Sequence, residues 1–270
     1  MTGPGSRGAG GSVSAAVRLH AWTERNLGRA VSVVQGVHDG LWLGAASREL
    51  LHAIDGDYYR HQGMYRDDGY NRSGLASWEA HVLDRFFAGR TRIAVTGAGA
   101  GREVLALLRR GHEPHGFECN AALVAAANRL LAAEAFDPLV SFVERDAWPA
   151  GTGDFDGVIV GWGSYMLMQG RARRVSFLRQ ARRHLAPRDP VLLSFFSRRG
   201  DRAYFRIVAR VANSLRRAAG REPVELGDTL RPNYLHCFTE EEIRAELDDG
   251  GFEPLFYAEE PYAHAVGVAR

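Results

Sequence analysis

Apolar runs and amphipathic segments alternate along the C-terminal two thirds of the chain. Runs of strand length, rich in Val, Ile, Leu and Phe, occupy residues 93–95, 140–143, 155–160 and 190–196. Segments with apolar positions at helical spacing lie at residues 102–110, 121–133 and 170–185. Continuous apolar runs are typical of strands buried on both faces, and their alternation with helices predicts a parallel sheet in an α/β fold. Residues 252–258 and 262–269 are expected to form a closing hairpin.

The first third of the chain has a different pattern. Residues 1–14 are rich in Gly and Ser and poor in apolar residues, which predicts a disordered tail. From residue 15 to about 55 the apolar positions follow helical spacing. Three glycines in this segment are expected to break the helical pattern into pieces: Gly36, Gly40 and Gly44.

An aromatic segment follows at residues 57–78. It places Tyr58, Tyr59, Tyr65 and Tyr70 among charged residues and glycines, with no regular period. Segments of this kind next to a binding site are typical of lids that exclude water, although a solvent-exposed loop is the alternative. We interpret residues 15–90 as a helical cap and lid over a site in the following domain, with a plain packing extension as the alternative.

A glycine-rich turn follows the first apolar run of the predicted sheet. Gly97, Gly99 and Gly101 stand at alternate positions, and glycine lets a ligand approach the backbone closely. About 20 residues beyond the turn, the second predicted strand ends at Glu118, where an acidic residue can accept hydrogen bonds from ribose hydroxyls. The turn reads GxGxG, whereas a dinucleotide fingerprint reads GxGxxG. The pattern therefore favours an adenosyl cofactor without a pyrophosphate.

The turn resembles motif I of the class I S-adenosylmethionine-dependent methyltransferases. The resemblance implies a Rossmann-like, doubly wound, seven-stranded sheet with an antiparallel last strand over residues 91–270, and S-adenosyl-L-methionine as cofactor. It also implies that substrate specificity is built by the helical insertion at residues 198–232. The chain departs from the family at Val95, where many members have an acidic residue, so backbone carbonyls are expected to contact the ammonium group of the cofactor.

The resemblance implies a set of cofactor-binding residues at the ends of the first four strands. Asp146 and Ala147 match the positions that bind adenine, although a lone Asp after a strand can simply cap a turn. Cys119 is expected to line the adenosine pocket or to be a small buried residue, and Trp162 to contact ligand or core. The expected cofactor-binding residues are Thr96, Gly97, Ala98, Gly99, Glu118, Cys119, Asp146, Ala147, Gly161 and Trp162.

The expected reaction is in-line displacement of a methyl group, which depends on positioning and on exclusion of water. A general base is needed only if the acceptor carries a proton that must leave early. His236 is the first candidate base, since histidine titrates near neutral pH, although a histidine held in a packed loop is the alternative. Tyr65 is a second catalytic candidate. Candidate substrate-binding residues are Tyr70, Tyr165 and Tyr234.

Composition narrows the function further. All 34 basic residues are arginine, which excludes a P-loop and Schiff-base catalysis by lysine. The absence of lysine also argues against the metal-dependent catechol type of methyltransferase, which relies on a lysine. A net charge of +2 gives no case for nucleic acid. The residues after the fourth strand lack clustered carboxylates, so no metal site is expected. Neither a membrane helix nor a signal peptide is apparent, and two cysteines fit a cytoplasmic protein.

Together, these observations predict a cytoplasmic methyltransferase that modifies O or N of a small molecule, with secondary metabolism as a candidate setting. The expected partner is a small-molecule methyl acceptor, with no nucleic acid and no membrane. Since such helical caps can supply a dimer surface, a homodimer stays open. The alternatives are a nicotinamide-dependent oxidoreductase and a non-catalytic protein that binds S-adenosylmethionine.

Overall fold

The computed structural model describes residues 9–149, 151, 153–199 and 203–270. The chain forms two compact units. One, the helical unit, consists of Met1–Ala45 and Asp201–Leu226; the other, the sheet unit, consists of Ala46–Gly200 and Gly227–Arg270. This division joins most of the predicted insertion to the N-terminal segment. No helix among the described residues combines the length and apolar character needed to cross a membrane.

The sheet unit contains a seven-stranded sheet in the order β3-β2-β1-β4-β5-β9-β8. The strands are β1 Arg92–Thr96, β2 Glu113–Glu118, β3 Val140–Phe142, β4 Gly157–Val160, β5 Pro190–Ser194, β8 Phe252–Ala258 and β9 His264–Ala269. The first five are parallel, and β9 runs antiparallel to both of its neighbours, β5 and β8. The predicted Rossmann-like sheet with an antiparallel last strand is confirmed.

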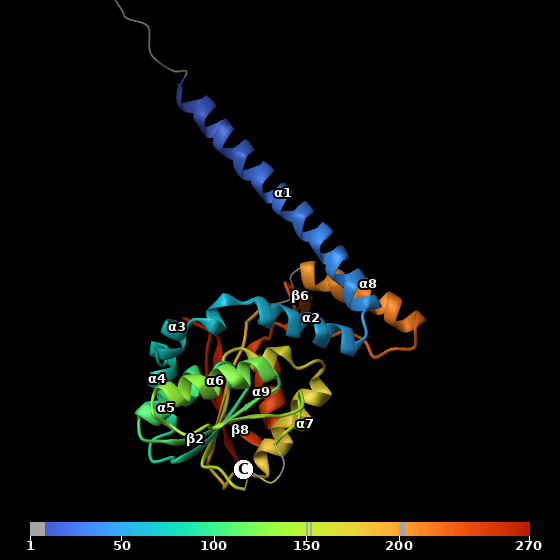
Figure 1. Ribbon diagram of the computed structural model, residues 1–270. Coiled ribbons are helices and arrows are strands. Elements are labelled where there is room, and N and C mark those ends of the chain that lie inside the picture. Colours follow the sequence, from blue (N-terminus) through green and yellow to red (C-terminus); the bar gives the residue numbers. More distant parts are fainter. Residues whose placement is uncertain (1–8, 150, 152, 200–202) are drawn as a thin grey trace, which may run out of the picture. The chain divides into compact units, whose positions relative to one another are not determined.

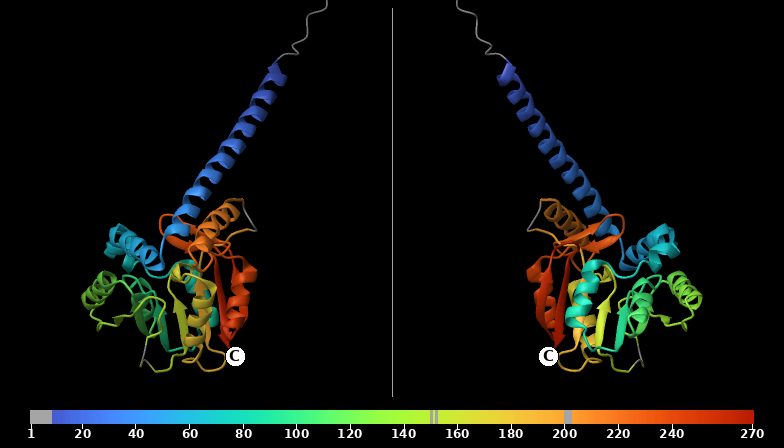
Figure 2. Two further views of the ribbon diagram at one scale, coloured as in Figure 1. Left: turned by 90° about the vertical axis from the view of Figure 1, so that its right-hand side faces the viewer. Right: turned by 90° about the vertical axis from the view of Figure 1, so that its left-hand side faces the viewer.

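Helices cover both faces of this sheet (Figure 2). Alternate residues of a strand point to opposite faces, so Ile93 and Val95 pack with the helices of one face while Ala94 packs with those of the other. One face carries α4 Ser77–Phe86, α5 Arg102–Arg109 and α6 Ala121–Ala133; the other carries α7 Arg171–Arg182 and α9 Glu240–Asp249. Burial on both faces explains why β1, β4 and β5 have continuous apolar sequences.

The remaining elements of the sheet unit lie outside the two helical layers. They are α2 Arg48–His61, the 3₁₀ helix η1 Gly63–Arg66, α3 Asp68–Arg72, the 3₁₀ helix η2 Ser164–Leu167, and the paired strands β6 Asp228–Leu230 and β7 Tyr234–His236. The segment predicted as an irregular tyrosine-rich lid thus consists mainly of α2, η1 and α3. The sheet order reverses between β1 and β4, and in open α/β sheets this position forms a ligand-binding crevice.

The helical unit consists of two packed helices, α1 Ala9–Ala45 and α8 Ala203–Ala218 (Figure 1). The expected interruption at Gly36 and Gly40 is wrong, because α1 is continuous over 37 residues. The helical segment does break directly after Gly44, since α1 ends at Ala45 and α2 begins at Arg48. Gly36, Gly40 and Gly44 lie against α8: a Cβ on Gly40 would be 2.8 Å from Val211 Cβ. Tertiary packing therefore outweighs the low helix propensity of glycine. Of the predicted tail, residues 1–8 lie outside the described residues, and residues 9–14 belong to α1.

Replacement of Gly40 by Ala is expected to loosen the packing of α1 on α8. The added methyl would meet Val211 and, at 3.0 Å, the carbonyl oxygen of Val208. Hydrogen exchange should show faster exchange in α8 of this variant. Gly28→Ala is the matched control, because its Cβ meets nothing within 4 Å and the change favours the helix by about 1 kcal/mol. Equal exchange in both variants would contradict the role assigned to Gly40.

Candidate functional site

A cavity of about 650 Å³ opens at the carboxyl ends of the parallel strands, within the sheet unit. Its volume lies in the range of about 300–1,000 Å³ that is usual for small-molecule sites. The cavity is lined by residues at the ends of β1 and β2, in the segments after β3 and β4, and at the start of α5. Residues of α2, η1 and α3 also line it. The cavity thus lies at the crevice that the sheet order predicts.

The glycine turn brings backbone directly to the cavity wall. Gly97 has a φ of 65°, in the left-handed region that favours glycine. A Cβ there would lie 2.0 Å from Ser164 Oγ, and a Cβ on Gly161 would lie 2.4 Å from the carbonyl oxygen of Gly97. The segments after β1 and β4 are therefore in direct contact, and only glycine fits at either position. Gly161 itself does not line the cavity, unlike Thr96, Gly97, Ala98 and Gly99.

Glu118 joins the end of β2 to this turn. Its Oε2 accepts a hydrogen bond of 2.9 Å from the N–H of Gly99, and its Oε1 accepts one of 2.9 Å from the N–H of Asn120. The carboxyl is 6% exposed, and burial raises its pKa, although both N–H groups oppose this shift. The thiol of Cys119 donates to the same carboxylate. Two carboxylate oxygens offer about four acceptor positions, so the group still has capacity to accept from a ligand hydroxyl.

Asp146, Ala147 and Cys119 line the same cavity, as the sequence predicts. Asp146 pairs with Arg48 of α2 over 3.2 Å, and burial raises the pKa of its carboxyl despite Arg145 and Arg48. Burial raises the pKa of the Cys119 thiol to about 12, so this thiol stays protonated at neutral pH. The residue is an inert wall of the cavity rather than a nucleophile.

The cavity face of α2 is a feature that the sequence analysis missed. His52, Asp55 and Tyr59 line the cavity. Asp55 forms a 2.5 Å ion pair with Arg145, which fastens α2 to the segment after β3. Burial, Arg145 and Arg48 lower the pKa of His52 to about 4. The spacing of these polar residues, i, i+3 and i+7, places them on one helix face and is the signal that could have revealed them.

Tyr65, the second catalytic candidate, and Tyr70, a candidate substrate-binding residue, line the cavity together with Tyr59. The rings of Tyr65 and Tyr59 lie 5.4 Å apart, and those of Tyr65 and Tyr70 lie 6.5 Å apart. A Cβ on Gly99 would be 3.9 Å from Tyr65 Cδ1, which places this ring beside the glycine turn. Burial raises the pKa of Tyr65, so its hydroxyl remains a hydrogen-bond donor at neutral pH.

Trp162 lines the cavity from the segment after β4, as predicted. Its ring packs at 5.1 Å against Tyr262 and lies 5.1 Å from the guanidinium carbon of Arg102. The residue contacts both the core and the cavity, so the two expectations for it are compatible.

Besides Gly161, three predicted site residues do not line the cavity. Tyr165 is fully buried and donates a 2.6 Å hydrogen bond to Glu246. Tyr234 is 3% exposed and donates to Asp228. The structure therefore gives both tyrosines structural surroundings instead of the expected place at the substrate.

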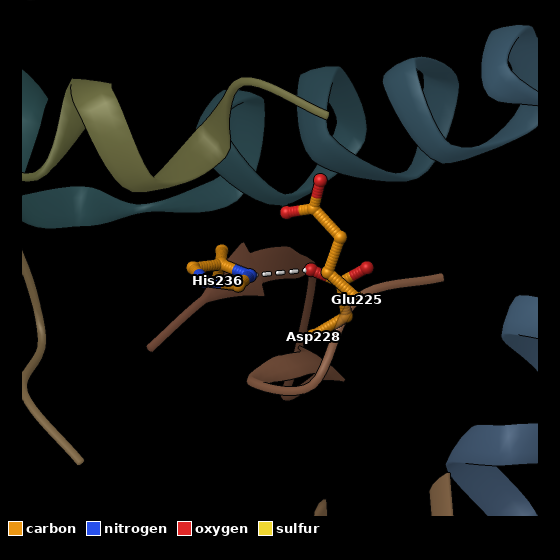
Figure 3. Close-up of side chains that lie close together, drawn as sticks. All are labelled: Glu225, Asp228 and His236. Carbon is orange, nitrogen blue, oxygen red and sulfur yellow. Dashed lines mark hydrogen bonds and ion pairs between the residues drawn. The ribbon is translucent and has the colours of Figure 1, made fainter. Parts of the chain in front are cut away.

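His236 is the third of these residues. Its Nδ1 lies 2.7 Å from Asp228 Oδ1, and the residue is 2% exposed (Figure 3). Burial disfavours the charged ring, but the interactions with Asp228 and Glu242 outweigh burial and raise the pKa of His236. A raised pKa reduces the neutral form that a general base needs. This is the packed, hydrogen-bonded histidine that was the alternative to a base.

Three buried polar atoms of the cavity wall have no hydrogen-bond partner among the described residues: His52 Nε2, Thr96 Oγ1 and Asn71 Oδ1. Thr96 is 5% exposed and Asn71 is 4% exposed. Buried polar groups are normally paired, so orphans in a cavity wall point to a polar ligand. Together with Glu118 and the glycine turn, they give the cavity wall a set of polar groups that can donate to and accept from a ligand.

Comparison with known proteins supports this fold. A sugar N-methyltransferase from a Streptoalloteichus species is 19% identical and aligns over 79% of this chain and 91% of its own, with a TM-score of 0.55. An amino pentose methyltransferase of calicheamicin biosynthesis from Micromonospora echinaspora, solved with S-adenosylmethionine, is 16% identical over 83% and 98%, with a TM-score of 0.52. The magnesium protoporphyrin IX methyltransferase of Synechocystis, also solved with bound S-adenosylmethionine, is 15% identical and aligns over 84% of this chain and 99% of its own, with a TM-score of 0.54.

These likenesses show that the chain has the fold of S-adenosylmethionine-dependent methyltransferases. No family model and no curated protein matches its sequence.

Proposed function

We propose that the protein is an S-adenosylmethionine-dependent methyltransferase that transfers a methyl group to O or N of a small molecule. The observation that carries the proposal is the link between Glu118 and the glycine turn, where one buried carboxylate holds the turn and retains free lone pairs in the cavity. The similar structures include sugar and amino pentose methyltransferases, which favours a small acceptor in secondary metabolism.

The cavity supplies one binding feature for each part of this cofactor. Asp146 and Ala147, after β3, suit adenine, because a carboxylate accepts from an amino group and a methyl side chain packs on a ring. Glu118 at the end of β2 suits the ribose hydroxyls. The backbone at Gly97 and Gly99 suits the methionine chain. The parts of the ligand thus follow the strand order from β3 to β1.

S-adenosylmethionine supplies a methyl group on a sulfonium that is already activated for displacement. An acceptor oxygen or nitrogen forms the new bond to the methyl carbon while the carbon–sulfur bond breaks and its electron pair stays on sulfur. The acceptor proton leaves to solvent or to a neighbouring group. The chain contributes positioning and exclusion of water, for which the rings of Tyr59, Tyr65 and Tyr70 provide an aromatic wall. Aromatic faces also attract a sulfonium by about 0.5–2 kcal/mol.

Of the two catalytic candidates, we retain Tyr65 as a residue that positions the methyl acceptor by donating a hydrogen bond to it. We do not retain His236 as a catalytic residue. The nicotinamide-dependent alternative is disfavoured by the GxGxG turn, since no third glycine at dinucleotide spacing opens α5. Cytoplasmic location and a homodimer stay predictions.

Methyl transfer itself is tested by the formation of S-adenosylhomocysteine from S-adenosylmethionine with small amines, alcohols and phenols as acceptors. We expect acceptor-dependent turnover that Glu118→Ala abolishes. Tight binding of S-adenosylmethionine without turnover on any amine, alcohol or phenol would instead support the non-catalytic alternative.

A further inference from the structure

A buried cluster of three charged side chains lies at the start of α5. Arg102 donates to Glu79 through both terminal nitrogens, at 2.7 Å each, and its Nη2 also donates to Glu103 Oε1 over 2.8 Å. All three residues are at most 6% exposed. Two carboxylates therefore share one guanidinium, and the cluster carries one negative charge in excess when both are ionised.

The two carboxylates are not equivalent. Glu79 is committed through both oxygens, since Oε2 also accepts from the N–H of Ala76 over 2.6 Å. Glu103 accepts through Oε1 from Arg102 and, at 3.4 Å, from the N–H of Trp162. Its Oε2 accepts no hydrogen bond from another residue in the part of the chain that the structure describes, and the further donor to this carboxyl is the backbone N–H of Glu103 itself. Glu103 lines the cavity, whereas Glu79 does not.

An excess negative charge inside a protein is costly unless a cation neutralises it. Protonation of a carboxylate is one way to remove this cost, and burial does raise the pKa of Glu103, against the opposing effect of Arg102. Binding of a cationic ligand next to the cluster is the other way to neutralise the excess charge. Glu103 contacts the backbone of Trp162, so its carboxyl lies where the segments after β1 and β4 meet. Along the strand order from β3 to β4, this position comes directly after the glycine turn.

We propose that Glu103 binds the ammonium group at the methionine end of S-adenosylmethionine. The inference rests on the proposed function, in which adenine, ribose and methionine chain follow the strands from β3 to β1, so that the amino acid end reaches Glu103. Glu103 then takes the place of the acidic residue that Val95 lacks, and a charged partner replaces the backbone carbonyls expected from the sequence. Glu79 and Arg102 are positioning residues that hold its carboxyl.

The proposal is tested by a cycle of two proteins and two ligands. Wild type and Glu103→Gln are titrated by calorimetry with S-adenosylhomocysteine and with its analogue lacking the amino group. We expect deamination to weaken binding to wild type by about 30-fold, as for loss of one charge-assisted hydrogen bond. Glu103→Gln should bind S-adenosylhomocysteine more weakly than wild type by a similar factor. Removal of the amino group from the ligand should then weaken its binding to this variant little further. Equal costs of deamination in both proteins would overturn the proposal.

Controls separate this role from a structural one. Glu144→Gln, which changes another carboxylate of the cavity wall, should leave the cost of deamination unchanged. Glu103→Gln without ligand should unfold at or above the wild-type Tm, because the change removes the excess charge; a structural acid would give a lower Tm. Should Glu103→Gln fail to fold, Glu103→Asp enters the cycle, and it should retain part of the coupling to the ammonium.

The remaining outcomes are also distinguishable. If wild type does not bind S-adenosylhomocysteine, the proposed function fails, and the inference with it. If wild type binds it and Glu103→Gln binds it equally well but shows a raised KM for an amine acceptor, the carboxylate serves the acceptor, and the proposal for the cofactor is wrong.

Discussion

Glu118→Ala is expected to weaken binding of S-adenosylhomocysteine by about 100-fold, the equivalent of roughly 3 kcal/mol from hydrogen bonds to a charged acceptor. The variant removes the acceptor for the ribose hydroxyls and, with it, the acceptor for the N–H of Gly99 and of Asn120. Those two N–H groups then lose their partner in the cavity wall. Calorimetric titration of the full chain measures the effect.

The matched control is Glu113→Ala, which changes the same residue type at the opposite, exposed end of β2. Its affinity should equal that of wild type. Glu118→Gln should fall between wild type and alanine, since an amide retains one acceptor oxygen but no charge. Wild-type affinity in Glu118→Ala would contradict the assignment of this carboxylate to the ribose.

Glu246→Ala is expected to lower the free energy of unfolding by about 3–5 kcal/mol, the usual cost of removing one partner from a buried ion pair. Arg174 and Glu246 are each 1% exposed, and their Nη2–Oε1 distance is 2.7 Å. Glu246 Oε2 also accepts from the hydroxyl of Tyr165 over 2.6 Å. Alanine at this position leaves a guanidinium in the core between α7 and α9 without its carboxylate, which solvent cannot replace. Urea unfolding measures the loss.

Two controls define this result. Glu240→Ala removes the partner of Arg244 on the same helix, in a pair whose side chains are both 44% exposed, and should change stability little. Tyr165→Phe, which keeps the ring and removes the hydroxyl, should cost less than Glu246→Ala and leave cofactor affinity unchanged. A large loss of cofactor affinity in Tyr165→Phe would restore Tyr165 to the binding site predicted from the sequence.

The parts of the site that are local in sequence were predictable. Gly97 follows β1, Glu118 ends β2 and Asp146 lies in the segment after β3, and the carboxyl ends of parallel strands necessarily meet at one edge of the sheet. The register brings them level, since Thr96 of β1 lies opposite Phe117 of β2 and Val160 of β4. Strand periodicity alone therefore indicates where the cofactor-binding residues gather.

The parts that depend on packing between distant segments were not predictable in this way. Asp55 reaches the cavity because α2 pairs with Arg145, and Glu103 gains its role from Glu79, which belongs to another helix. His236 has the chemistry of a base, but the sequence cannot show that Asp228 pairs with its ring. The type of a residue indicates which chemical role it can have, whereas tertiary contacts set the direction of its side chain.

The N-terminal helix is a second case in which packing between distant segments decides the structure. Glycines at a spacing of four lower helix propensity by about 1 kcal/mol each, which favours a broken segment. The same spacing places Gly36, Gly40 and Gly44 on one face, and that face packs closely on α8. Only a partner helix, distant in sequence, decides between the two readings.

The most direct test of the central claim is calorimetric titration of the full chain with S-adenosylhomocysteine, alone and in the presence of NADH. The proposed function predicts saturable binding of one ligand per chain that NADH does not weaken. Binding of NADH that displaces S-adenosylhomocysteine, or no binding of S-adenosylhomocysteine at all, would contradict it.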